Sequence, residues 1–299
     1  TSGPSRERTL DGLTLQRLRD GEQVPITGLP DGARISGVSW SPDGERIAFV
    51  NTDDRRLSLW YAELGDGEAR RITPEGMGLN GVYGRAYDWL RDAEHVVVRA
   101  VPAGRGPVPE ESYVPAGPVV QENLGQKVPA RTLQDLLENA HDETLFDYYT
   151  TSQVHVVELD GDARAIGEPG VVSMMDPSPD GEYLLTRTIH RPYSYSLQED
   201  RFPTRIEVWD LDRGEVAYEV ADLPLQDQIP LAFGSVATGP RSVQWRSDEA
   251  AQLVWVEALD GGDGGAEAEE RDRVFTLDAP FDEEPRPLIT LANRFGGIM

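Results

Sequence analysis

The chain has 299 residues and a formal net charge of −25, from 53 acidic and 28 basic side chains. A surface with this much negative charge repels nucleic-acid phosphates and anionic lipid headgroups. We therefore expect neither nucleic acid nor membrane as a partner. Two explanations of the charge stay open: adaptation to a salt-rich (halophilic) cell, or an acidic face for a cationic partner. The chain has no cysteine, which excludes disulfides and thiolate chemistry.

No stretch approaches the roughly 18 consecutive apolar residues that a transmembrane helix needs, so we do not expect a membrane-embedded protein. The expected location is the cytoplasm, or the periplasm or exterior, of a bacterium. The sequence opens Thr1-Ser2-Gly3-Pro4 without methionine, which indicates a processed or engineered product.

The first predicted elements are one or two edge strands between Leu10 and Leu29, where apolar residues alternate loosely. A stronger pattern follows at Val38–Val50, where two short apolar strands flank a Ser-Pro-Asp-Gly turn. Pro42 fixes φ for the first turn position and Gly44 tolerates positive φ, so the chain reverses here.

The same turn recurs along the chain. Its aspartate stands at Asp43, Asp92, Asp180 and Asp248, and a second apolar hairpin follows each copy. Two hairpins make four strands, and a repeat of about 40–50 residues with four strands is typical of a propeller blade. We therefore predict an all-β fold, a β-propeller with about four four-stranded blades in this chain. The alternative is an ordinary β-sandwich with similar turns.

The predicted blades span residues 36–73, 84–167, 170–222 and 239–291, with insertions at residues 103–150 and 187–205. The first insertion is proline-rich at its start, which favours an extended path. Thr132 then offers an N-cap, and the apolar residues that follow share one helical face. These features predict one short inserted helix over residues 132–140, after which Phe146, Tyr148 and Tyr149 lead back into the sheet.

The spacings that common active sites require are missing from the sequence. No G-x-S-x-G nucleophile elbow or glycine-rich phosphate loop occurs, and the four histidines lack zinc-ligand spacing. The acidic stretch from Asp260 to Glu270 lacks the EF-hand pattern, so we interpret it as a solvated turn rather than a calcium site. We expect no catalytic residue, metal or cofactor in this chain.

Several longer motifs lie in the insertions and between the strands. They are RTLQDLL (131–137), LFDYYTTSQ (145–153), IHRPYS (189–194), DLPL (222–225), IPLAF (229–233) and DGGD (260–263). Together they resemble the N-terminal propeller of glutamyl endopeptidase-like members of the prolyl oligopeptidase family of serine peptidases. The similarity extends over nearly the whole chain.

The resemblance implies a propeller of seven or eight blades followed by an α/β-hydrolase domain with the catalytic triad. This sequence ends after about four blades, so we expect the hydrolase domain to be absent and the open sheet edges to permit self-association. The implied function is the non-catalytic propeller portion of a serine peptidase that cleaves acidic (glutamyl) peptides, with the propeller controlling substrate access. The alternative is a free-standing bacterial propeller that binds a protein or another ligand.

An enzyme that recognises a glutamyl carboxylate needs a cation, and arginine suits this role through bidentate pairing. The candidate substrate-binding residues are Arg131, His190, Arg191 and Arg201, all in the two insertions, where propellers place functional loops. We predict that they form a basic patch with nearby tyrosines. The alternative is that they pair with the abundant surface acids.

Overall fold

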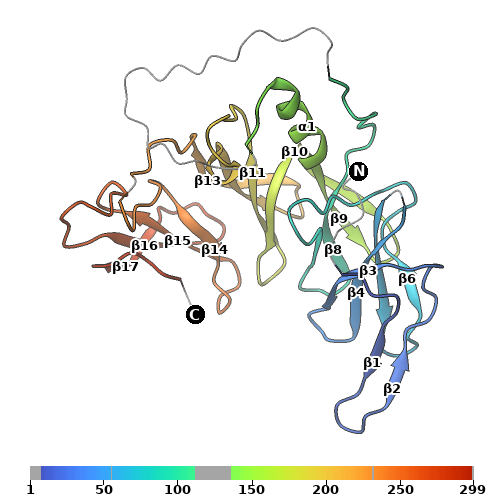
Figure 1. Ribbon diagram of the computed structural model, residues 1–299. Helices are drawn as coiled ribbons and strands as arrows, with labels where there is room; N and C mark the ends of the chain where they lie inside the picture. Colours follow the sequence, from blue (N-terminus) through green and yellow to red (C-terminus); the bar gives the residue numbers. More distant parts are fainter. Residues whose placement is uncertain (1–7, 55, 112–135, 231, 298–299) are drawn as a thin grey trace. The chain divides into compact units, whose positions relative to one another are not determined.

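The computed structural model describes residues 8–54, 56–111, 136–230 and 232–297 (Figure 1). The chain divides into two compact units. The first comprises Thr1–Pro107 and Tyr148–Val172, and the second comprises Val108–Asp147 and Ser173–Met299. Nearly all the regular secondary structure described in both units is antiparallel strand, which confirms the predicted all-β propeller class.

The first unit contains a short hairpin and two sheets. The hairpin is formed by β1 (Thr14–Gln16) and β2 (Gln23–Pro25), and the first sheet by β3 (Ile35–Trp40), β4 (Arg46–Thr52), β5 (Leu57–Glu63) and β6 (Ala69–Arg71). The second sheet runs through β7 (Tyr87–Trp89), β8 (His95–Ala100), β9 (Ser152–Glu158) and the first residues of β10 (Ala163–Pro177).

The second unit repeats this arrangement. The end of β10 neighbours β11 (Tyr183–Ile189), which pairs with β12 (Thr204–Asp210) and then β13 (Glu215–Leu223). The last sheet is β14 (Arg241–Trp245), β15 (Gln252–Ala258), β16 (Asp272–Asp278) and β17 (Arg286–Leu291). All these pairs join strands that follow each other in sequence, as a four-stranded meander requires. The blade boundaries given above remain a prediction.

The recurring turn is held by its own side chains. At Asp43 the carboxylate accepts the hydroxyl of Ser41 at 2.5 Å and the backbone N–H of Glu45 at 3.0 Å. The turn at Asp180 repeats both bonds with Ser178 and Glu182, at the same two distances. The glycine that follows each aspartate has positive φ, 74° and 82° respectively. The reversal therefore depends on local residues, which is why the sequence pattern predicts it.

Each unit buries apolar faces between neighbouring sheets. In the first unit, Val50 and Leu59 pack with Val96 and Val157. In the second, Leu185 and Val208 belong to one cluster with Trp245, Leu253 and Leu277. Tyr87 ties the first pair of sheets together, because its hydroxyl has the carbonyl oxygens of Gly37 (2.6 Å) and Ala48 (2.9 Å) as acceptors for its one proton. Burial raises the pKa of Tyr87 to about 12.

The structure confirms one α-helix but moves it from the predicted position. Helix α1 spans Ala140–Thr150, whereas Leu136–Asn139 are not helical and residues 132–135 lie outside the described residues. The N-cap is Asn139, whose side-chain oxygen accepts the N–H groups of His141 (2.8 Å) and Asp142 (3.0 Å). Phe146, Tyr148 and Tyr149 form the second half of this helix, which leads into the sheet at β9 (Ser152–Glu158).

Candidate functional site

The predicted site residues map to one loop, as far as the structure describes them. Strand β11 ends at Ile189 and β12 begins at Thr204, so residues 190–203 form a loop that we call the 190–203 segment. It carries His190, Arg191 and Arg201 and belongs to the second unit. Arg131 lies outside the described residues. A single turn of 3-10 helix, η1 (Glu199–Arg201), ends the segment.

Arg191 is engaged by helix α1. Its guanidinium pairs with Glu143 and, at 2.7 Å, with Asp147, two carboxylates one helical turn apart. The hydrogen bonds that Arg191 donates to Asp147 and Glu143 raise the pKa of Arg191, although partial burial lowers it. The exposed fractions of the side chains are 50% for Arg191 and 16% for Glu143. Arg191 is thus a half-exposed cation between two internal acids.

Two tyrosines of the same segment reinforce this contact. Tyr193 donates its hydroxyl to Asp147, and Tyr195 donates to Glu143 at 2.6 Å. The guanidinium of Arg191 lies over the Tyr193 ring, 4.7 Å from its centroid, in a cation–π contact. Burial is the largest cause that raises the pKa of Tyr193, and the bond to Asp147 adds to it. Both phenols therefore stay protonated and act as donors.

An aromatic cluster fills the space beside the ion pairs. The ring of Phe146, on α1, meets Tyr193 edge-on with centroids 4.9 Å apart and Phe202 with centroids 5.9 Å apart. Tyr193 and Phe202 stack at 5.1 Å. The 190–203 segment thus contacts α1 through one guanidinium, two phenol hydroxyls and an aromatic surface. We call this set of contacts the α1 clamp.

His190 lies at the start of the segment and faces a different carboxylate. Its Nε2 is 2.8 Å from an oxygen of Asp222, at the end of β13, and its Nδ1 is 2.8 Å from the carbonyl of Arg191. Asp222 also accepts a bond from Arg205 at 3.1 Å. The contact from His190, followed by that from Arg205, lowers the pKa of Asp222 although desolvation opposes this. These contacts fix the segment to the sheet edge.

Arg201 differs from Arg191 because it has only a marginal ion pair. The one that the structure gives within its described part is with Asp200, at 4.0 Å, and Asp200 is 72% exposed. Arg201 lines a pocket of about 430 Å³ between η1 and the loop that follows β13. Asp227 and Phe233 also line this pocket, and Phe233 is fully exposed. The backbone N–H of Gln226 donates to the carbonyl of Arg201 at 2.9 Å and holds the two walls together.

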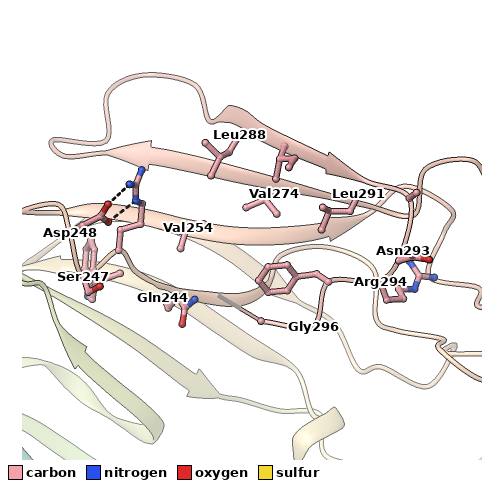
Figure 2. Close-up of a pocket in the computed structure, with 16 residues that line it drawn as sticks. Gln244, Ser247, Asp248, Val254, Val274, Leu288, Leu291, Asn293, Arg294 and Gly296 are labelled. Carbon is pink, nitrogen blue, oxygen red and sulfur yellow. Dashed lines mark hydrogen bonds and ion pairs between the residues drawn. The ribbon is translucent and has the colours of Figure 1, made fainter. Parts of the chain in front are cut away.

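A larger pocket, of about 950 Å³, lies against the sheet of strands β14–β17 (Figure 2). Val254, Val274 and Leu291 line its sheet side, and the last described residues, including Arg294 and Gly296, line another (Figure 2). Arg246 and Asp248 pair at 2.6 Å at one end. The walls are mostly apolar and offer few groups for chemistry.

Sequence reasoning did not identify Glu143, Asp147 or Phe233 as parts of these sites. Glu143 and Asp147 lie in α1, and only the motif LFDYYTTSQ marked part of that region; Phe233 closes the motif IPLAF. Nowhere in the described ranges do three His, Asp or Glu side chains come together in a way that could hold a metal. Neither described helix has the length and apolar character needed to cross a bilayer.

Comparison with known proteins gives two long matches. A probable chloroplastic glutamyl endopeptidase from Oryza sativa subsp. japonica is 41% identical over 98% of this chain, and the protein of the same name from Arabidopsis thaliana is 40% identical over 98%. The chain spans 32% of the length of each relative. No protein-family model matches it.

The acylaminoacyl peptidase of Pyrococcus horikoshii is similar in structure over 92% of this chain and 34% of its own, with 13% identity and a TM-score of 0.44. The two long sequence matches show which proteins this chain is related to. They confirm the resemblance inferred from the motifs: over nearly its whole length, the chain is homologous to one part of proteins named probable glutamyl endopeptidase.

Proposed function

We propose that this chain is the propeller portion of a serine peptidase that cleaves acidic peptides, and that it controls substrate access without supplying catalytic residues. The observation that carries the proposal is the 41% identity, over 98% of the chain, to a probable glutamyl endopeptidase. The catalytic groups would belong to an α/β-hydrolase domain elsewhere in the whole protein, and further blades would complete the propeller. The peptide substrate is the proposed partner.

Within this function, Arg131, His190, Arg191 and Arg201 are the proposed contacts for substrate carboxylates. Arg201 is best placed among those that the structure describes, since it lines a pocket and has only a 4.0 Å ion pair. Asp200 and Asp227 line the same pocket and oppose the binding of an anion. A substrate carboxylate must therefore form a direct, bidentate contact with Arg201 to bind well.

The test is the variant Arg201→Ala in the whole peptidase. Loss of a charge-assisted contact to the substrate should lower kcat/KM by roughly 10- to 100-fold for a peptide with glutamate at the cleavage position. The matched peptide with glutamine should lose far less. Arg213→Ala is the control, because Arg213 is 75% exposed in the turn between β12 and β13 and, among the described residues, its ion pair is with a local aspartate. Equal losses on both peptides would show that Arg201 only supports the loop.

A further inference from the structure

Helix α1 binds the 190–203 segment in the way an acidic, aromatic peptide would. It presents Glu143 and Asp147 to Arg191, and Phe146 to the rings of Tyr193 and Phe202. We propose that α1 is an internal competitor: it occupies the peptide-binding surface of the 190–203 segment, and an acidic substrate peptide displaces it. This inference rests on the proposed recognition of acidic peptides and adds an autoinhibitory contact to it.

The surface beneath α1 has the chemistry of a recognition site. Arg191 offers a planar set of N–H donors that suits carboxylates. The hydroxyls of Tyr193 and Tyr195 each donate to one of the same two carboxylates, so each acid receives a charged and a neutral donor. The rings of Tyr193 and Phe202 give a flat apolar surface for one aromatic side chain. A peptide with an acid, an aromatic residue three positions later and a second acid beside it would satisfy every group.

The helix lies against this surface and is only partly buried. Thr150 is its one buried residue, and most of its other residues, including Phe146, are partly buried. The guanidinium of Arg191 is half exposed although Glu143 is only 16% exposed, so an incoming carboxylate can reach the cation from the solvent side. The last turn of α1 is anchored separately, since Asn80 donates to the carbonyl of Tyr149 at 3.0 Å, so displacement frees the part of the helix that carries Glu143 and Asp147. An incoming carboxylate can therefore replace an internal one while the end of the helix stays attached.

The experiment uses the 299-residue chain and a fluorescent peptide with the sequence of residues 141–148, HDETLFDY, which copies the internal ligand. Its neutral counterpart, HNQTLFNY, is the control peptide. Binding of the acidic peptide should raise the hydrogen-exchange rate of the backbone amides of residues 143–147, because the displaced helix loses the α1 clamp. The neutral peptide should leave these rates unchanged. Binding of the acidic peptide with no change in α1 would overturn the proposal.

The double variant Glu143→Gln/Asp147→Asn removes the internal carboxylates. The acidic peptide should then bind roughly five- to tenfold more tightly, because the competent surface is no longer mostly occupied. The control Glu267→Gln/Glu269→Gln changes the net charge equally at exposed turn residues and should leave the affinity unchanged. Arg191→Ala should abolish binding, and the melting temperature of each variant reports whether the sheets remain folded.

The outcomes separate the two proposals. If the peptide binds the native chain and the double variant equally, acidic-peptide recognition stands and competition by α1 is excluded. If it binds neither, recognition by this segment is wrong and the competition falls with it. If both double variants tighten binding equally, the effect is general electrostatic repulsion by a chain of charge −25, and α1 has no specific role.

Discussion

The sheet of strands β3–β6 and the sheet of strands β14–β17 share one meander but hold their neighbouring segments by different chemistry. The β1–β2 hairpin region covers one face of the β3–β6 sheet, where Leu15 and Ile26 pack against Ile47 and Phe49. This cover consists of aliphatic and aromatic side chains. Its stabilisation comes from the removal of apolar surface from water and does not involve a titrating group.

The β14–β17 sheet is instead tied to its neighbouring loops by buried ions. The side chains of Asp272 and Asp260 are both 0% exposed, and the guanidinium of Arg294 lies 2.9 Å from the first and 2.8 Å from the second. Arg241 also pairs with Asp272, at 2.9 Å, and Arg271 with Asp260, at 2.9 Å. One apolar face of this sheet has a thin cover: its buried valines pack with Leu291 of β17 and, from outside the sheet, with Phe295 among the described residues. The large pocket lies on this face.

The difference shows that sheets with the same strand order can be held to their neighbouring segments by apolar packing or by buried ion pairs. The two kinds of contact respond differently to pH and to mutation. An apolar cover tolerates changes of pH and salt but depends on shape. A buried ion network depends on every charge having its partner, because an unpaired charge in the interior is costly. Mutations chosen for each mechanism can therefore separate the two regions.

The largest effect is expected from Asp272→Asn. The variant removes one carboxylate charge from a site where Arg241 and Arg294 are mostly buried, so the free energy of unfolding should fall by about 3–5 kcal/mol. Chemical denaturation followed by tryptophan fluorescence measures this change. Asp282→Asn is the control, since Asp282 is exposed on the β16–β17 turn. A loss below about 1 kcal/mol would show that the network is not a structural element of this sheet.

The dependence of the free energy of unfolding on pH in acid gives a second test of Asp272→Asn. Burial raises the pKa of Asp272, but the N–H of Phe295 and the guanidinium groups of Arg241 and Arg294 outweigh it, so the pKa lies below the ordinary value of 3.8. A lowered pKa in the folded state means that the stabilisation is complete above 3.8 and is lost as the pH falls through the folded-state value. Asp272→Asn should therefore show a shallower loss of stability in acid than the native chain.

A smaller effect is expected from Ile26→Ala, which opens the apolar cover of the β3–β6 sheet. Ile26 is 6% exposed, and its truncation should cost about 2–4 kcal/mol through lost burial and the cavity left behind. The cost should be the same at pH 4 and pH 7, since no titrating group is involved. A cost that changed with pH would mean that the hairpin is also held by charges.

The contrast also explains what the sequence could predict. The turns at Asp43 and Asp180 are made by residues within five positions of each other, so a local pattern specifies them. The start of α1 was misplaced because both Thr132 and Asn139 are acceptable N-caps. The contacts that engage α1 come from distant residues such as Phe202.

The candidate site shows the same limit. The sequence identified Arg191 and Arg201 as cations in an insertion, but it could not show which of them already has internal partners. That distinction depends on Glu143 and Asp147, more than 40 positions away. The pocket at Arg201 likewise depends on a second loop, whose Phe233 no local pattern relates to η1. The sequence pattern therefore could not predict the contacts between segments that are distant along the chain.

The smallest effect on stability is expected from Leu288→Ser, on the thinly covered face of the β14–β17 sheet. Leu288 is 56% exposed, so the free energy of unfolding should change by no more than about 0.5 kcal/mol. The same change should reduce the fluorescence of an apolar dye bound by the chain, because Leu288 lines the pocket of about 950 Å³. Leu18→Ser is the control: Leu18 is 99% exposed between β1 and β2, outside this pocket, and its loss should leave dye binding unchanged. Equal reductions in both variants would mean that the dye reports scattered surface leucines, and the β14–β17 face would then be no more open than the covered face of the β3–β6 sheet.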